Sequence, residues 1–297
     1  MSKNSQSALE RIFRPAPTPD TKPLPATGRA GRNLPAAVAS ALILLIAVGL
    51  ALFFARTIFV VFVGLLVLLA VWEVAGAFAR RGLTVMLPPL YLGAVGIILA
   101  SALGSLPWIM YSLYLTAIVS AAWRIFSGSL PGRPIMDVIA TWFVLLYIPF
   151  MAAFVGLMSS HSGRDPWPLV FFVVVVVCND LGGWLAGIML GKHPMAPKLS
   201  PKKSWEGFGG SVAMCALGGW IGTLVLGIPW WWALVMGATG AIIGTLGDLT
   251  ESLIKRDVGL KDMSSIIPGH GGILDRVDAM LFAAPAFYLI YSSALGW

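Results

Sequence analysis

The chain has 297 residues, of which 58% are hydrophobic and only 11% are charged. In soluble globular domains about a quarter of the residues are charged, so this composition excludes a soluble domain and indicates an all-α, polytopic membrane protein. The formal net charge of +7 would suggest nucleic-acid binding in a soluble protein. In a membrane protein it is typical of basic loops that face anionic lipid, so we expect membrane lipid as a partner and no nucleic acid.

The first 34 residues are polar, and five prolines lie among scattered Arg, Lys, Ser and Thr. Such a composition has too few apolar side chains to bury a core. We therefore expect residues 1–34 to form a disordered, proline-rich cytosolic tail, followed by a single transmembrane catalytic domain over residues 35–297. We expect no cleavable signal peptide, because the first apolar stretch starts too far from Met1.

The rest of the chain contains apolar segments long enough to be membrane-spanning helices. A helix of about 20 residues crosses roughly 30 Å of hydrocarbon. The sequence predicts about nine such helices, near 35–54, 57–79, 86–104, 106–126, 134–158, 166–190, 208–226, 229–247 and 279–296.

The distribution of basic residues predicts the orientation of these helices. If the amino terminus is cytosolic, only Arg56 and Arg164 of the 20 Lys and Arg residues fall outside cytosolic segments. Because Lys and Arg are enriched in cytoplasmic loops, we expect a multi-pass protein of the cell (cytoplasmic) membrane with a cytosolic amino terminus. Two polar loops, residues 191–207 and 252–278, then face the cytosol.

The first polar loop, residues 191–207, is rich in lysine. Ser200 followed by Pro201 is a typical N-cap and first-turn pair, so we expect a short helix to begin there with its free N–H groups exposed. Such a loop suits a polyphosphate, and it is equally consistent with a topology signal or a lipid-headgroup patch. The lysines concerned are Lys198, Lys202 and Lys203.

The second polar loop, residues 252–278, carries eight of the chain's 33 charges. If the eighth span continues past residue 247, four polar side chains line one face of it. Asp248, Glu251, Ser252 and Lys255 would then stand at positions i, i+3, i+4 and i+7.

Asp275 and Asp278 are likewise three residues apart, at the entrance to the ninth span. Because the eighth and ninth spans would run antiparallel, the two carboxylate faces can meet at the cytosolic end of the bundle. Several carboxylates in a small site need a cation, since like charges repel there. Oxygen ligands without a His or Cys set favour Mg²⁺ or a similar hard ion, either one ion or two.

Three further features are candidates for function. Residues 268–272 hold three glycines in four positions and can let backbone N–H groups approach phosphate oxygens, although such a turn is also common before a helix. His270 within it fits an acid, a base, a phosphate donor or a structural hydrogen bond. Asp180 interrupts the sixth span, and an ionisable residue at membrane depth is a functional candidate. Glu73, in the second span, is expected to pair with another helix.

Together the two loops resemble the phosphatidate cytidylyltransferase family, also called CDP-diacylglycerol synthase. The similarity covers about residues 178–280, while the amino-terminal half matches only in hydropathy. After Asp180 the family usually has an Ala and an aromatic Tyr or Phe, where this chain has Gly183 and Trp184. The matching positions are Ser252, Lys255, Arg256, Lys261, Asp262, Ser264, Pro268, His270, Gly271, Gly272, Asp275, Arg276 and Asp278, with Ala196, Pro197, Lys198, Ser200, Pro201, Lys203, Trp205, Glu206, Gly207, Gly247, Asp248 and Glu251 before them.

This resemblance implies that CTP and phosphatidate give CDP-diacylglycerol and pyrophosphate, by metal-assisted in-line attack at the α-phosphorus. It implies Mg²⁺ as cofactor and suggests a homodimer. The catalytic residues would be Asp248, Asp275, Asp278, Lys255, Lys261 and Arg276, with metal bound by Asp248, Asp275, Asp278, Asp180 and Glu251. Substrate contacts would come from Lys198, Ser200, Lys203, Trp205, Glu206, Ser252, Arg256, His270, Gly271 and Gly272.

Two other functions remain open from the sequence. A CTP-dependent prenol or dolichol kinase would use similar loops but would transfer the γ-phosphoryl group. A transporter could use Asp180 and Glu73 as an ion path, and it predicts paired broken helices and inverted repeats. The hydropathy pattern indicates neither of these features.

Overall fold

The computed structural model describes residues 12, 13, 15, 18, 49, 52, 53, 56–127, 133–163, 165–264, 266 and 271–297. Apart from one two-stranded hairpin, the regular structure within these ranges is helical, which confirms the predicted all-α membrane fold. The elements in chain order are α3 (Arg56–Ala79), α4 (Leu87–Ala102), α5 (Leu106–Phe126), α6 (Pro134–Leu145), η1 (Leu146–Phe150), α7 (Met151–His161), α8 (Trp167–Leu190), β1 (Pro194–Ala196), β2 (Ser200–Ser204), α9 (Trp205–Leu226), α10 (Trp232–Val258) and α11 (Leu274–Leu295).

Among the described residues, seven helical segments are long and apolar enough to cross a membrane. One of them is the run Pro134–His161, in which α6, η1 and α7 follow one another without a break. An eighth apolar helix, α4, has only 16 residues, fewer than the roughly 20 that a perpendicular crossing needs. The predicted span at 35–54 and the predicted tail at 1–34 fall almost entirely outside the described residues, so the number nine stays a prediction.

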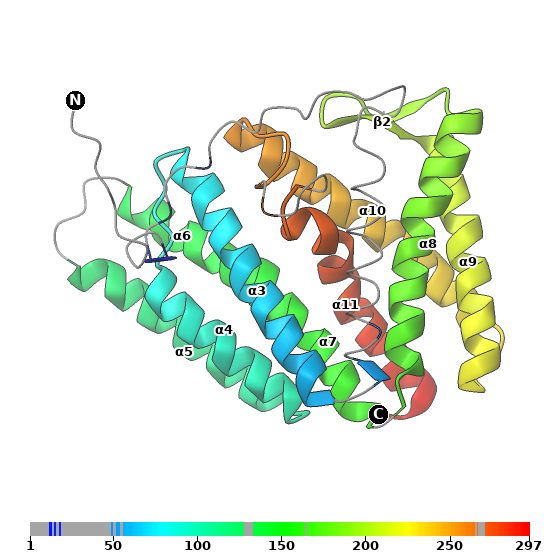
Figure 1. Ribbon diagram of the computed structural model, residues 1–297, viewed down its shortest axis with the longest axis horizontal. Helices are drawn as coiled ribbons and strands as arrows, with labels where there is room; N and C mark the ends of the chain where they lie inside the picture. The colour runs from blue at the N-terminus through cyan, green and yellow to red at the C-terminus, as the bar shows by residue number, and fades with distance from the viewer. Residues whose placement is uncertain are drawn as a thin grey trace.

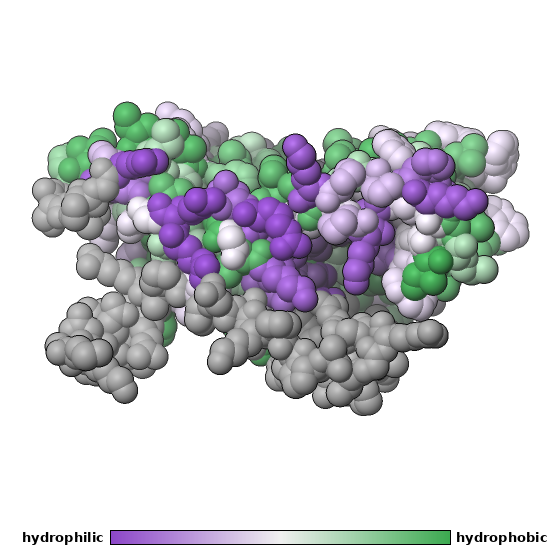
Figure 2. Space-filling view, turned by 90° about the horizontal axis from the view of Figure 1, so that it is seen from above, coloured by the Kyte–Doolittle hydropathy of each residue, from purple (hydrophilic) through white to green (hydrophobic). Residues whose placement is uncertain are grey.

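The helices lie side by side with their polar ends gathered at one end of the molecule (Figure 1). The carboxyl ends of α3, α8 and α10, the amino ends of α9 and α11, and the hairpin are all at this end. Seen from there, hydrophilic residues gather across the middle of the described surface, with hydrophobic residues on either side (Figure 2). The helix ends therefore bring the two polar loops to one face.

Two clusters of buried apolar side chains hold the bundle together. One lies mainly among α3, α4, α7 and the η1 turn, and the other joins α8, α9, α10 and α11. Helices α8 and α9 pack very closely, because a Cβ on Gly182 would lie 2.4 Å from the carbonyl oxygen of Gly210. Gly182 therefore allows close packing of α8 against α9.

The expected helix at Ser200 and Pro201 is not formed. Instead β1 and β2 pair antiparallel, with Pro194 opposite Ser204 and Ala196 opposite Ser200. The helix α9 starts five residues later, where the Ser204 hydroxyl accepts a hydrogen bond of 3.1 Å from Gly207 N. The prediction was wrong because both Ser200 and Ser204 can cap a helix. The backbone around Ser200 is instead paired with β1, so the helix begins after Ser204.

Candidate active site

Helix α10 continues to Val258, past residue 247, where the predicted span ends. The predicted polar face on this helix required such a continuation. Asp248, Glu251, Ser252 and Lys255 therefore lie on the last turns of one helix. Beside it, α11 runs in the opposite direction (Figure 1). The two helices touch near Gly247, where a Cβ would lie 2.9 Å from the Asp278 carbonyl oxygen. The two carboxylate faces meet as predicted.

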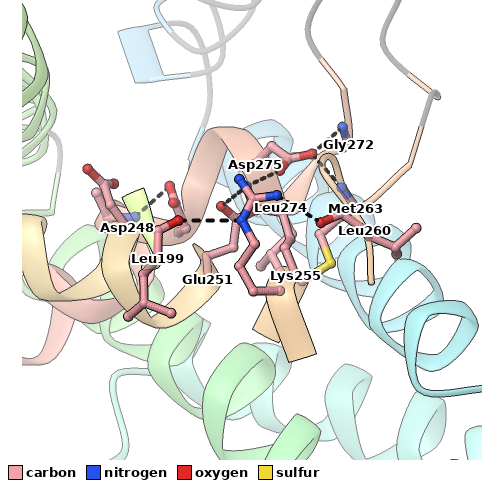
Figure 3. A network of polar contacts seen from close by, with 12 residues as sticks. Leu199, Asp248, Glu251, Lys255, Leu260, Met263, Gly272, Leu274 and Asp275 are labelled. Atoms are coloured by element: carbon pink, nitrogen blue, oxygen red, sulfur yellow. Dashed lines mark hydrogen bonds and ion pairs between the residues drawn. The ribbon is translucent and has the colours of Figure 1, made fainter. Parts of the chain in front are cut away.

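Lys255 connects the two helices through a buried ion-pair network (Figure 3). Its Nζ lies 2.5 Å from Glu251 Oε2 and 2.7 Å from Asp275 Oδ1. The side chains of Lys255, Glu251 and Asp275 are only 13%, 3% and 4% exposed. In this position, which is shielded from bulk water, one ammonium group therefore holds together two carboxylates that would otherwise repel each other.

The other oxygen of Asp275 organises the loop before α11. Its Oδ2 accepts hydrogen bonds from the backbone N–H groups of Met263, at 2.9 Å, and Gly272, at 2.7 Å. Asp275 thus has one oxygen on Lys255 and the other on the loop backbone. This arrangement fixes the start of α11 and the segment from Met263 relative to the end of α10.

Asp248 meets the first polar loop through Lys203. The Lys203 Nζ lies 2.5 Å from Asp248 Oδ2, and both side chains remain partly exposed, at 28% and 22%. Nearby, Arg256 on α10 donates a 3.4 Å hydrogen bond to the carbonyl oxygen of Leu199 in the hairpin (Figure 3). The Arg256 contact joins the two polar loops, and the Lys203 contact joins the first of them to Asp248, 45 residues away in the chain, so these segments form one site.

A polar pocket of about 230 Å³ opens beside this contact. It is lined by Asp180 of α8, Asp248 of α10 and Lys203 of β2, together with Lys202 and Thr245. The pocket thus joins three of the predicted site residues from three different elements.

Asn179 also lines the pocket and was not assigned by the sequence analysis. Its Nδ2 donates to Asp180 Oδ1 at 3.1 Å, and its Oδ1 accepts from Thr245 Oγ1 at 3.2 Å. Asn179 therefore orients Asp180 and ties α8 to α10. The sequence did contain a signal for this role, because Asn179 is a second polar residue directly beside Asp180 after a valine-rich run.

The site carries a concentration of negative charge. Asp180, Asp248 and Asp278 lie close enough for their charges to interact. Glu251 Oε1 is buried and accepts no hydrogen bond within the described part of the chain. The His, Cys, Asp and Glu side chains among the described residues do not form a group of three or more arranged to hold a metal ion. Lys203 pairs with Asp248, Lys255 pairs with Glu251 and Asp275, and the charge of Arg276 also interacts with Asp180.

Tyr147 is a further polar residue beside the carboxylates that the sequence did not reveal. It lies in the π-helical turn η1, which contains Pro149, and such turns are frequent at functional sites. Its ring packs edge-on against Phe282 of α11, at 5.7 Å between ring centres. Its buried hydroxyl has no hydrogen-bond partner among the described residues and interacts electrostatically with Asp278.

The remaining predicted residues lie around this centre rather than in it. Glu206 accepts from Lys192 N at 3.1 Å and His193 N at 3.2 Å, so it closes the base of the hairpin loop. Trp205 is 58% exposed. His270 lies outside the described residues. Lys198 in the hairpin turn and Lys261 after α10 are exposed, whereas Ser200 of β2 and Ser252 of α10 are partly buried. Gly271 and Gly272 lie in the turn before α11.

Arg276 lies between the carboxylates and an apolar pocket, and its charge interacts with Asp180. It lines an apolar pocket of about 120 Å³ between α3, α7, α8 and α11, together with Ala70, Ala152, Phe172 and Met280. Among the described residues that line this pocket, Arg276 alone is charged. Since Asp275 and Asp278 stand on either side of it in the chain, this apolar pocket adjoins the carboxylate site.

Residues 35–294 match the Cytidylyltransferase family, so the similarity begins well before residue 178, where the sequence analysis placed it. The chain is 32% identical to the phosphatidate cytidylyltransferase of Mycobacterium bovis, with 98% of each chain covered. It is 33% identical to that of Mycobacterium leprae over 87% of each chain. It is 38% identical to that of Haemophilus influenzae over 48% of this chain and 54% of the relative.

Proposed function

The chain belongs to the cytidylyltransferase family, which confirms the resemblance of its two loops, and we propose that it is a phosphatidate cytidylyltransferase. It would transfer the cytidylyl group of CTP to phosphatidate, giving CDP-diacylglycerol and pyrophosphate for phospholipid synthesis. The observation that carries this proposal is the polar pocket in which Lys203 of the hairpin faces Asp248 and Asp180 at a polar end of a membrane bundle.

The reaction joins two anions, and the site offers cations to bring them together. A phosphate oxygen of phosphatidate forms a bond to the α-phosphorus of CTP, while the bond from that phosphorus to the α–β bridging oxygen breaks. Pyrophosphate leaves with the electron pair. No general base is needed, because a phosphomonoester is already ionised near neutral pH. Catalysis then consists of positioning the two phosphates and neutralising their charge.

We propose that the lysines divide this work by their position. Lys203 is partly exposed at the mouth of the polar pocket and can turn from Asp248 to the CTP phosphates. Lys198 and Lys261 are exposed at the same face and would attract the triphosphate from the cytosol. Lys255 is held by two carboxylates, so it would preserve the architecture of the site and contribute fixed positive charge.

The chemistry of the carboxylates suits a hard cation such as Mg²⁺, although the described side chains are not arranged around one. All the donors are oxygens, the charges of Asp180, Asp248 and Asp278 repel one another, and Asp278 also acts on Glu251, whose buried Oε1 has no hydrogen-bond partner among the described residues. We propose that Asp248, Asp278 and Asp180 bind the ion, supported by Glu251 and Asp275. The chemistry that a bound Mg²⁺ supplies is neutralisation of the phosphate oxygens.

The apolar pocket beneath Arg276 suits the lipid substrate. Its walls are the apolar faces of spanning helices, so an acyl chain can lie there while the phosphate stays near Arg276. Arg forms bidentate contacts with phosphate oxygens. Because Asp275 and Asp278 flank Arg276, a phosphate bound there would be held beside the carboxylate site where CTP reacts.

We further propose that the hydrophilic face seen in Figure 2 lies on the cytosolic side of the cell membrane. The positive-inside distribution of Lys and Arg supports this orientation, and CTP is supplied from the cytosol. The family resemblance suggests a homodimer, which light scattering of the detergent-solubilised protein would measure.

The experiment that tests the proposal follows two labels of CTP. Purified protein in phosphatidate liposomes receives CTP labelled at either the α- or the γ-phosphorus, with Mg²⁺. We expect the α label in the lipid fraction and the γ label in water-soluble pyrophosphate. With prenol or dolichol in place of phosphatidate, neither label should enter the lipid. A γ label in the lipid fraction would instead show a CTP-dependent kinase and overturn the proposal.

A further inference from the structure

Glu73 of α3 reaches across the bundle to the start of α11. It is only 1% exposed. Its Oε1 accepts hydrogen bonds from Ser264 Oγ at 2.6 Å and Ile273 N at 2.8 Å, and its Oε2 accepts one from Leu274 N at 2.9 Å. The donors are 191 to 201 residues away in the chain, so this carboxylate joins the amino-terminal half to the second polar loop.

These contacts replace a cap that α11 does not provide itself. The first N–H groups of a helix have no partners within it and favour negative charge. The residue before α11 is Ile273, whose side chain makes no capping hydrogen bond. Glu73 supplies the missing acceptor from another helix. Because Leu274 directly precedes Asp275, the cap acts one residue away from the carboxylate network.

The carboxylate of Glu73 also leaves no room for a side chain at Gly272. A Cβ built on Gly272 would lie 2.8 Å from both oxygens of Glu73 and 3.0 Å from its Cδ. Side-chain atoms do not approach a Cβ that closely without a shift. The close approach of Glu73 therefore gives a reason for glycine at this position that is separate from phosphate binding.

We infer that Glu73 is a positioning residue for the transfer reaction, a role that rests on the proposed function. Asp275, in the first turn of α11 itself, holds the preceding loop through Met263 N and Gly272 N and is tied to α10 by Lys255. Glu73 of α3 binds the next two backbone N–H groups. With Lys255 holding it to α10 and Glu73 holding it to α3, the first turn of α11 has a fixed rotation, and that rotation sets where Asp278 and Arg276 point.

The main test is Glu73→Gln, which keeps the size of the side chain but places an NH₂ group against one of its N–H donors. We expect kcat to fall about 10- to 100-fold, because small misplacements of catalytic groups cost that much. The KM for CTP should change less than threefold. Amide hydrogen exchange in peptides from residues 271–280 should become faster, and this readout does not depend on activity.

Thr141→Val is the matched control. Thr141 is also fully buried, but its Oγ1 accepts a 3.1 Å hydrogen bond from Met86 N before α4 rather than from the loop before α11. This variant should lower the unfolding temperature while leaving kcat and exchange at 271–280 unchanged. If Glu73→Gln behaves in the same way, with normal kcat per folded molecule, Glu73 has only a structural role and the inference is overturned.

A double-mutant cycle tests the contact itself. Glu73→Asp draws the carboxylate back from Gly272, so Gly272→Ala should lower kcat much less in the Glu73→Asp background than in the wild type. Additive effects would contradict a shared contact. If Glu73→Gln does not fold, Ser264→Ala removes only one of the hydrogen bonds and should show the same changes more weakly. Wild-type kcat and exchange in Ser264→Ala would contradict the inference.

Failure of the proposed function gives a different pattern. A folded wild type that forms no CDP-diacylglycerol contradicts the reaction, whereas exchange at 271–280 still shows whether Glu73 positions α11. Unchanged exchange in Glu73→Gln contradicts the positioning role whatever the reaction is.

Discussion

Lys255 and Asp275 join the end of one membrane-spanning helix to the start of the next, with Lys255 Nζ 2.7 Å from Asp275 Oδ1. The same ammonium group lies 2.5 Å from Glu251 Oε2, one helical turn earlier. Two carboxylates thus share one cation in a buried position, and a further cation beside them would relieve their repulsion.

Lys255→Met should destabilise the protein strongly. It leaves Glu251 and Asp275 facing each other without a cation, and breaking a buried ion pair in this way costs about 3–5 kcal/mol. The measurement is the unfolding temperature in detergent. Lys192→Met, which removes an exposed lysine, is the control and should change nothing. Adding Glu251→Gln to Lys255→Met should restore part of the loss; no difference between the lysine variants would contradict the network.

Asp248→Asn and Asp278→Asn should each lower kcat by about two to three orders of magnitude, because fixed charge in such sites contributes that much. The unfolding temperature should stay near that of the wild type, since each change keeps the shape of the side chain. Turnover of CTP into CDP-diacylglycerol is the measurement. Near-normal turnover in both variants would remove the metal assignment.

Lys203→Met should weaken the use of CTP. A charge-assisted contact contributes roughly 1.5–3 kcal/mol, so kcat/KM for CTP should fall about 10- to 100-fold. The kcat/KM for phosphatidate at saturating CTP should change much less. Lys192→Met, in the same loop but outside the polar pocket, is the matched control. Equal losses in both lysine variants would show that only the overall charge of the loop matters.

The spacing of polar residues on α10 was predictable because a helix repeats every 3.6 residues. Asp248, Glu251 and Lys255 had to share a face once the helix continued, and the antiparallel course of α11 placed Asp275 opposite them. The sequence predicted that the first polar loop and the end of α10 lie close together. It could not predict that Lys203 is the residue that pairs with Asp248, since several lysines lie in the same loop.

Other parts of the site depend on contacts between distant segments. Glu73 was expected to pair with another helix, and it does contact the start of α11, but two of its three partners are backbone N–H groups, which leave no trace in a sequence. Tyr147 faces the carboxylates only because η1 changes the helical period near Pro149. The hairpin replaced the expected helix at Ser200 because strand pairing with β1 is a non-local interaction that a local capping pattern does not reveal.

Removal of divalent metal should abolish activity and lower stability. We expect a chelator to stop CDP-diacylglycerol formation and Mg²⁺ to restore it. Independently of activity, Mg²⁺ with CTP should raise the unfolding temperature of the wild type, because a ligand that binds only the folded state stabilises it. The shift should be absent in Asp248→Asn. An equal shift in both proteins would place the metal elsewhere.

Arg276→Gln should raise the KM for phosphatidate while leaving the KM for CTP within about twofold, because the variant loses one phosphate contact on the lipid side.

Ala152→Phe, which fills the apolar pocket, should discriminate against long acyl chains. Initial rates with short-chain and long-chain phosphatidate measure both effects. Parallel changes in the two KM values for Arg276→Gln would argue that the arginine acts on the whole site.

One time course with purified protein in phosphatidate liposomes, with CTP and Mg²⁺, tests the proposed cytidylyl transfer. CDP-diacylglycerol and pyrophosphate are measured together, with folded Asp248→Asn as the blank. We expect the wild type to form the two products in equal amounts and the blank to form almost none. If folded wild-type protein forms no more CDP-diacylglycerol than the blank, the chain does not catalyse this reaction.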